Sequence, residues 1–263
     1  MLFPYSSQHL QAYLETTLET AQTQEIMNSL LEQFKQDAAG DNFINPALQG
    51  REKVEQVVRF AQSLIAADRK IPALKRLQGL VWKQGYASGA LRAIVYDDVA
   101  PFLQHMRARK VPVGIYSSGS RGAQQLLFQH TNCGDLRSLL SVYFDTTVGQ
   151  KQVAASYADI LLTLGCTSSG PAAGAASPSE VLFVTDVLAE AVAAREAGMR
   201  AVISVRPGNA PLAEDHGFPE ITSFSQLMKI ADEECSWRAS DSVDVLCWML
   251  PTTQMACHGD VIS

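Results

Sequence analysis

The first 92 residues place apolar side chains at intervals of three and four, which is the pattern of amphipathic helices. One such run lies between residues 10 and 21, and another between residues 54 and 65. Pro72, directly before Ala73-Leu74-Lys75-Arg76-Leu77, is typical of the first residue of a helix. No strand pattern occurs before residue 93. We therefore expect residues 1–92 to form an all-helical domain.

From residue 93 onward, short continuous apolar runs alternate with helical stretches. The expected strands cover residues 111–116, 139–144, 181–184, 201–205 and a short piece near Ile221, and the expected helices cover 99–109, 121–130, 154–164 and 188–197. Continuously apolar strands separated by helices are typical of a parallel sheet that is covered on both faces. Residues 93–231 are therefore expected to form an α/β core.

Two segments differ from this alternation. Residues 167–179 are a low-complexity loop rich in Ser, Gly, Ala and Pro. Residues 232–263 follow no clear period and form a divergent C-terminal tail, although residues 243–250 within it resemble a strand. A zinc site built on Cys257 and His258 would need a regular ligand spacing that the tail does not have.

The composition excludes several classes of partner. The net charge of -6 argues against binding to nucleic acid or to an anionic membrane. The five cysteines form no regular framework, no apolar run approaches the ~18 residues of a membrane span, and the N-terminus lacks the basic region of a signal peptide. We expect a cytoplasmic monomer.

Three strand ends carry polar side chains suited to phosphate chemistry. The strand at 111–116 leads into Ser117 and Ser118, the turn after the next strand leads to Lys151, and the strand at 181–184 leads to Asp186. Ligands of open parallel sheets lie beyond the carboxyl ends of the strands. Hydroxyl groups at a helix N-terminus, a lysine and a carboxylate that can bind Mg²⁺ are what phosphoryl transfer needs.

Each of these residues also has a structural alternative. A serine that begins a helix is commonly an N-cap, and a lysine before a helix is commonly solvated. A carboxylate at a strand end is commonly a helix cap as well. Their joint placement at successive strand ends favours the functional interpretation.

The order of these motifs resembles that of the haloacid-dehalogenase superfamily. The residues within each motif resemble those of its enolase-phosphatase (acireductone synthase) branch. The matching stretches run from about residue 2 to 228 and include Leu77-Gln78-Gly79 with Trp82, Ile115-Tyr116-Ser117-Ser118-Gly119-Ser120, Phe144-Asp145-Thr146-Thr147-Val148-Gly149 with Lys151, Leu182-Phe183-Val184-Thr185-Asp186-Val187, Val205-Arg206-Pro207-Gly208-Asn209-Ala210 and Ile221-Thr222-Ser223-Phe224.

This resemblance implies an α/β phosphatase core with a helical cap. Ser117 and Ser118 would bind the phosphate, Lys151 would be catalytic and would steady the phosphoryl group, and Asp186 would hold Mg²⁺. The substrate of the family is the small phosphorylated molecule 2,3-diketo-5-methylthiopentyl-1-phosphate. It is enolised and dephosphorylated to an acireductone in methionine salvage.

The chain departs from the family in one respect. Family members begin with a strand that ends in Asp-x-Glu-Gly-Thr and supplies the nucleophilic aspartate, and this chain starts after that point. Asp97-Asp98 is not followed by a Gly-Thr turn and is expected to be a helix cap instead. Whether the chain is an enzyme therefore stays open. The alternative is a catalytically silent form that binds phosphate ligands or partners.

The missing strand would lie in the centre of the sheet, between the strand that ends at Tyr116 and the strand that ends at Val184. An empty position would leave two rows of buried backbone groups unpaired, at a cost of roughly 1–3 kcal/mol for each group. Three outcomes are open: the two strands pair directly, another segment fills the position, or the domain stays loose. Residues 243–250 are the only spare strand-like segment.

Overall fold

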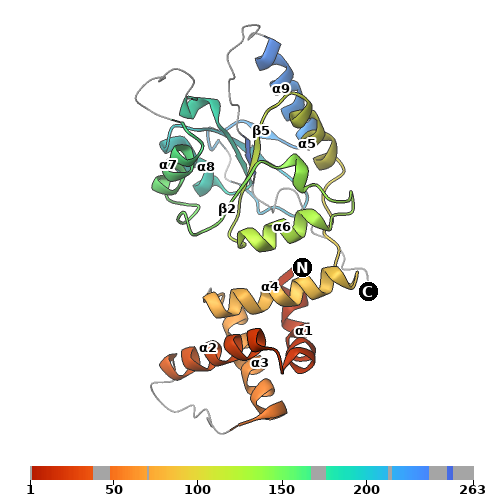
Figure 1. The fold of residues 1–263 in the computed structure, drawn as a ribbon. Helices are drawn as coiled ribbons and strands as arrows, with labels where there is room; N and C mark the ends of the chain where they lie inside the picture. Colours follow the sequence, from red (N-terminus) through yellow and green to blue (C-terminus); the bar gives the residue numbers. More distant parts are fainter. Residues whose placement is uncertain are drawn as a thin grey trace. The chain divides into compact units, whose positions relative to one another are not determined.

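The computed structural model describes residues 2–37, 48–69, 71–166, 176–212, 215–236 and 248–250. The chain divides into two compact units, with the boundary between Leu91 and Arg92 (Figure 1). Of the expected loop at 167–179, residues 167–175 lie outside the described residues, and so do Cys257 and His258, the residues considered for a zinc site.

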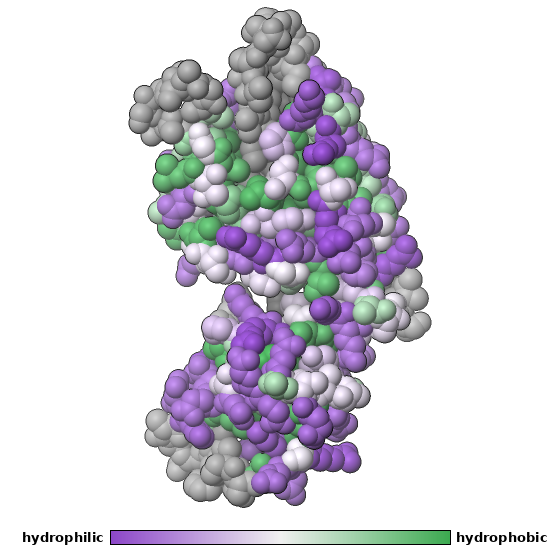
Figure 2. All heavy atoms as spheres, in the orientation of Figure 1, coloured by the Kyte–Doolittle hydropathy of each residue, from purple (hydrophilic) through white to green (hydrophobic). Residues whose placement is uncertain are grey.

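The N-terminal unit is helical, as the apolar spacing predicted. It contains α1 (Leu2–Thr17), α2 (Ala21–Asp37), α3 (Gly50–Ala66) and α4 (Pro72–Ala87). Leu10, Leu14, Ile26 and Leu30 are fully buried, so the apolar stripes of these helices face one another. The visible face of the unit is mostly hydrophilic (Figure 2).

The second unit is a parallel sheet with helices on both faces, so the expected fold class is confirmed. Its strands are β1 (Val113–Tyr116), β2 (Val142–Phe144), β3 (Leu182–Thr185), β4 (Arg200–Ser204), β5 (Glu220–Ile221) and β6 (Trp248–Leu250). Its helices are α5 (Val99–Ala108), α6 (Arg121–Gln129), α7 (Ala154–Thr163), α8 (Leu188–Glu196) and α9 (Phe224–Ser236). Helices α7 and α8 lie on one side of the sheet, and α5 and α9 lie on the other (Figure 1).

Most strands and helices of this unit lie within two residues of their expected limits. Helix α9 continues through Ser236, beyond the expected start of an irregular segment at residue 232. Gly198 follows the C-cap residue of α8 and has a φ of 94°, a conformation that suits glycine.

The C-terminal strand β6 fills the centre of the sheet. The strand order is β2-β1-β6-β3-β4-β5, and every pairing is parallel. Met249 is paired with Gly114 of β1 on one side and with Phe183 of β3 on the other. Of the three outcomes left open by the sequence, the second is therefore correct, because the end of the strand-like run 243–250 occupies the position.

Two physical constraints account for this placement. Strands β1 and β3 are buried along their whole length, so the backbone groups that face the central position need hydrogen-bond partners. A parallel neighbour requires a crossover connection, and α9 lies between β5 and β6 in the chain. Pro251 follows Leu250 and has no N–H group, so it cannot donate to a continued ladder.

No helix among the described residues is long and apolar enough to cross a membrane.

We predict that deletion of residues 237–263 prevents stable folding of the second unit, whereas deletion of residues 251–263 does not. The first deletion removes β6 and leaves the facing edges of β1 and β3 unpaired, at roughly 1–3 kcal/mol for each buried group. Their sum exceeds the usual stability of about 5–15 kcal/mol. Chemical denaturation and hydrogen exchange at 113–116 and 182–185 measure the effect. Equal protection in both deletions would contradict it.

Candidate functional site

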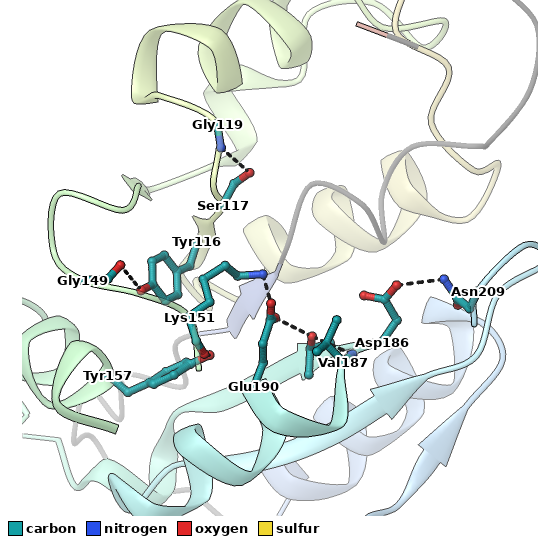
Figure 3. Close-up of polar contacts among 11 residues, drawn as sticks. Tyr116, Ser117, Gly119, Gly149, Lys151, Tyr157, Asp186, Val187, Glu190 and Asn209 are labelled. Atoms are coloured by element: carbon teal, nitrogen blue, oxygen red, sulfur yellow. Dashed lines mark hydrogen bonds and ion pairs between the residues drawn. The ribbon is translucent and has the colours of Figure 1, made fainter. Parts of the chain in front are cut away.

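The expected site residues lie beyond the carboxyl ends of two strands that flank β6. Ser117 directly follows β1 and Asp186 directly follows β3. Because β1, β6 and β3 are parallel, these two residues leave the sheet at the same edge, two strand positions apart with β6 between them. Figure 3 shows both residues together with Lys151. The structure thus brings the three parts of the predicted site to one edge.

The loop after β1 is held in place by hydrogen bonds of its own. The Ser117 N–H donates to the Phe144 carbonyl at 3.1 Å, and Ser117 Oγ accepts from the Gly119 N–H at 3.2 Å. Gln124 Nε2 donates to the carbonyls of Gly119 and Phe144, both at 2.8 Å. Ser117 is buried, whereas Ser118 is exposed. The two serines therefore present one fixed and one solvent-facing hydroxyl group.

The N-cap of α6 is Ser120 rather than Ser117. Ser120 Oγ accepts from the Ala123 N–H at 3.3 Å, so the serine of this loop that serves as a helix N-cap is Ser120.

The N-terminus of α6 also holds a carboxylate of the protein itself. Asp145, which follows β2, accepts from the Arg121 N–H at 3.0 Å and from the N–H and hydroxyl of Thr147 at 3.0 and 2.6 Å. Burial alone would raise the pKa of Asp145, but these donors outweigh it and lower that pKa. A phosphate at this loop would therefore share the helix N-terminus with Asp145.

Lys151 lies in an ion pair instead of being solvated. Its Nζ is 2.6 Å from Glu190 Oε2, and the two side chains are only 14% and 9% exposed. The same Nζ lies 5.9 Å from the ring centroid of Tyr116, the last residue of β1. The Tyr157 hydroxyl donates to the Lys151 carbonyl at 2.6 Å, and burial together with the Glu190 charge raises the pKa of Tyr157. The ammonium group is thus fixed beside the Ser117 loop.

Glu190 is the site residue that sequence reasoning missed. Its Oε2 also accepts from Thr185 Oγ1 at 2.7 Å, so one carboxylate oxygen joins Lys151 to the end of β3 (Figure 3). The available pattern was an acidic residue in the first helical turn after Asp186. The helix dipole alone also favours an acidic residue at that position, so the sequence does not distinguish a site residue from an ordinary one there.

Asp186 accepts a hydrogen bond from Asn209 Nδ2 at 2.9 Å. The N-cap residue of α8 is Val187, so Asp186 is not the helix cap that was its structural alternative. A carboxylate is a hard oxygen ligand, and Mg²⁺ commonly takes one or two of them together with water and substrate oxygens. The described residues hold no group of three potential metal ligands. Asp186 therefore fits Mg²⁺ as one ligand of an incomplete set.

Asp98 is the N-cap residue of α5, as expected, but its side chain makes no capping bond to that helix. It accepts instead from the N–H of Phe224, the first residue of α9, at 2.8 Å and pairs with Arg206 at 2.8 Å. Asp98 thus caps a helix that is distant in sequence, which local patterns do not reveal.

The arrangement can bind a phosphoryl group through hydroxyl donors and a fixed cation, with a carboxylate for a metal opposite them. A carboxylate nucleophile would have to enter between Ser117 and Asp186, beyond the end of the central strand. The residue that follows β6 in the sequence is Pro251.

We predict that Glu190→Gln destabilises the second unit by about 3 kcal/mol, because it leaves the buried Lys151 charge without its partner. The double variant Lys151→Met with Glu190→Gln should recover part of this loss. The exposed Glu196, on the same helix, gives the matched control Glu196→Gln, which should change stability by less than about 0.5 kcal/mol. Urea denaturation measures all four proteins. Similar small effects of both glutamine variants would refute the buried pair.

We predict that Asp145→Asn destabilises the protein by about 2 kcal/mol at neutral pH, because a charged acceptor of hydrogen bonds is lost. The folded pKa of Asp145 is lowered, so its contribution is present above the unfolded value of about 3.9 and disappears as pH falls through the folded pKa. The difference from wild type should therefore be constant from about pH 5 to 8 and shrink below about pH 4. Denaturation of both proteins at several pH values tests this prediction. The variant Asp159→Asn, at an exposed position, is the control. A stability difference between Asp145→Asn and wild type that does not change with pH would contradict it.

Comparison with known proteins supports the resemblance read from the sequence. Residues 6–198 match the family model of haloacid dehalogenase-like hydrolases. Over 232 residues, the chain is 47% identical to a "probable bifunctional methylthioribulose-1-phosphate dehydratase/enolase-phosphatase E1" of Arabidopsis thaliana, and 43% identical to the protein of that name from Physcomitrium patens. These matches cover 86% of this chain and 44% of each relative.

The chain thus spans less than half the length of the curated relatives that it matches. Among solved structures, the UTR4 protein of Saccharomyces cerevisiae is similar, with a TM-score of 0.64 and 32% sequence identity. That similarity covers 85% of this chain and 89% of the yeast chain. The sheet, the residues at its carboxyl edge and these similarities agree, and the chain belongs to the haloacid dehalogenase-like hydrolase family.

Proposed function

We propose that the chain is an enolase-phosphatase of methionine salvage, which converts 2,3-diketo-5-methylthiopentyl-1-phosphate to an acireductone and releases phosphate. The observation that supports it most is the placement of Ser117, Lys151 and Asp186 at one edge of the sheet. The similarity to plant proteins whose names include enolase-phosphatase supports this activity, and the substrate is the one that the sequence resemblance implies.

In this proposal, each residue has a distinct role toward the phosphate. The hydroxyl groups of Ser117 and Ser118 donate to phosphoryl oxygens, and the ammonium group of Lys151 offsets their negative charge. Glu190 holds that ammonium group in position. Asp186 would hold Mg²⁺, which when bound supplies a further positive charge at the phosphoryl group.

The helical unit is proposed as the cap that excludes water from the substrate and sets specificity. A cytoplasmic location is part of the same proposal. The free thiols of Cys133 and Cys166 are consistent with a reducing compartment.

A second candidate function is favoured by the place of β6. The covalent route of an aspartyl phosphatase needs a carboxylate beyond the central strand. In this sheet the central strand is β6, and Pro251 follows it. The 263 residues as they stand would then bind small phosphorylated ligands without turnover.

We predict that the 263-residue chain binds inorganic phosphate but releases none from the diketo phosphate, whereas a chain extended before Met1 by a strand ending in Asp-x-Glu-Gly-Thr releases it with Mg²⁺. The reason is that the extension supplies the nucleophile, once its strand takes the central position. Phosphate release and calorimetric binding are the measurements.

Two variants of the extended chain serve as controls. Asp186→Ala should abolish release, and Lys151→Ala should raise KM and lower kcat together, because the lysine charge acts on bound substrate and transition state alike. Binding without release by the extended chain would favour the silent form. Release by residues 1–263 alone, lost in Asp186→Ala, would refute the requirement for the added strand.

A further inference from the structure

The segment after β4 forms a tight turn that ends at Asn209. The Asn209 N–H donates to the Arg206 carbonyl at 3.1 Å, with Pro207 and Gly208 between them. Gly208 has a φ of 89°. Proline at the second position and a glycine with positive φ at the third are the features of a type II turn. The fixed φ of Pro207 and the hydrogen bond from Asn209 to Arg206 therefore hold the backbone of Asn209 in place.

The first residue of this turn is anchored in the core of the unit. Arg206 is buried and pairs with Asp98 at 2.8 Å. Its guanidinium group lies between the rings of Tyr96 and Phe224, at 4.7 Å from each centroid, and donates to the Thr222 carbonyl at 3.2 Å. These contacts fix the start of the turn against α5 and α9.

The orientation of the Asn209 amide follows from its neighbours. Asn209 Oδ1 accepts from the Arg206 N–H at 2.6 Å, and a backbone N–H can only donate. The oxygen of the amide must therefore face Arg206, which directs the NH₂ group to Asp186 Oδ2 at 2.9 Å. Figure 3 shows the two side chains turned toward each other.

We infer that Asn209 is a positioning residue for Asp186, and this rests on the proposed role of Asp186 as a Mg²⁺ ligand. By donating to one carboxylate oxygen, Asn209 fixes the plane of the carboxylate and so the direction in which its remaining lone pairs can bind a cation. Hydrogen bonds to a ligating carboxylate tune a metal site from outside its ligand shell, and their loss typically costs about 10- to 100-fold in affinity.

The test measures the binding of Mn²⁺, a spectroscopic substitute for Mg²⁺, to the full 263-residue chain by electron paramagnetic resonance of free Mn²⁺, with Mg²⁺ as competitor. Asn209→Ala should raise the dissociation constant about 10- to 100-fold. Gly217→Ala is the control for stability, because Gly217 has a φ of 73° and open space around its added methyl group. It should lose stability through strain yet bind Mn²⁺ as wild type does.

Asp186→Ala, measured in parallel, separates this inference from the proposed function. If Asp186→Ala abolishes binding while Asn209→Ala retains wild-type affinity, the positioning role is overturned and the metal ligand stands. If Asp186→Ala retains wild-type affinity, the metal assignment and the positioning role both fail. Equal losses in Asn209→Ala and Gly217→Ala would mean that the turn acts only through stability, which also overturns the inference.

Discussion

The backbone ladder in the centre of the sheet is the interaction on which the rest of the second unit depends. Strands β1 and β3 are buried along their length and carry the Ser117 loop and Asp186 at their ends. Without a strand between them, their facing N–H and C=O groups would have neither water nor protein as partners. Strand β6 pairs with Val113, Gly114 and Ile115 of β1 and with Leu182 and Phe183 of β3, and it sets the spacing of the two strands at about two strand widths, roughly 10 Å.

The charges described at the site edge have partners within the protein. Lys151 is paired with Glu190, Asp186 accepts from Asn209, and Asp145 accepts from the N-terminus of α6. Such pairing keeps the side chains in fixed positions before a ligand arrives, because each would otherwise be costly to bury. It also means that an anion must compete with Glu190 for Lys151. The pairing with Glu190 thus fixes the Lys151 side chain but weakens its attraction for an incoming anion.

Local patterns predicted most of the fold, since the spacing of apolar residues determines whether a segment buries one helical stripe or a whole strand. They also placed Ser117, Lys151 and Asp186 at the ends of strands. What they could not predict depends on contacts between distant segments. Asp98 caps a helix 126 positions away, and Glu190 pairs across 39 positions. The place of β6 depends on an unfilled position in the sheet, which no pattern within residues 243–250 contains.

Stability and chemistry meet at the same central position but make different demands on it. For stability, any extended segment with regular N–H and C=O groups suffices, because the ladder is made by the backbone. For phosphoryl transfer by a covalent route, the residue just beyond the strand must be a carboxylate that can reach the phosphate between Ser117 and Asp186. Strand β6 meets the first demand, and the Pro251 that follows it does not meet the second. A sheet of this kind can therefore keep its fold and the polar side chains at its carboxyl edge while the identity of one strand decides whether a covalent route of phosphoryl transfer is open.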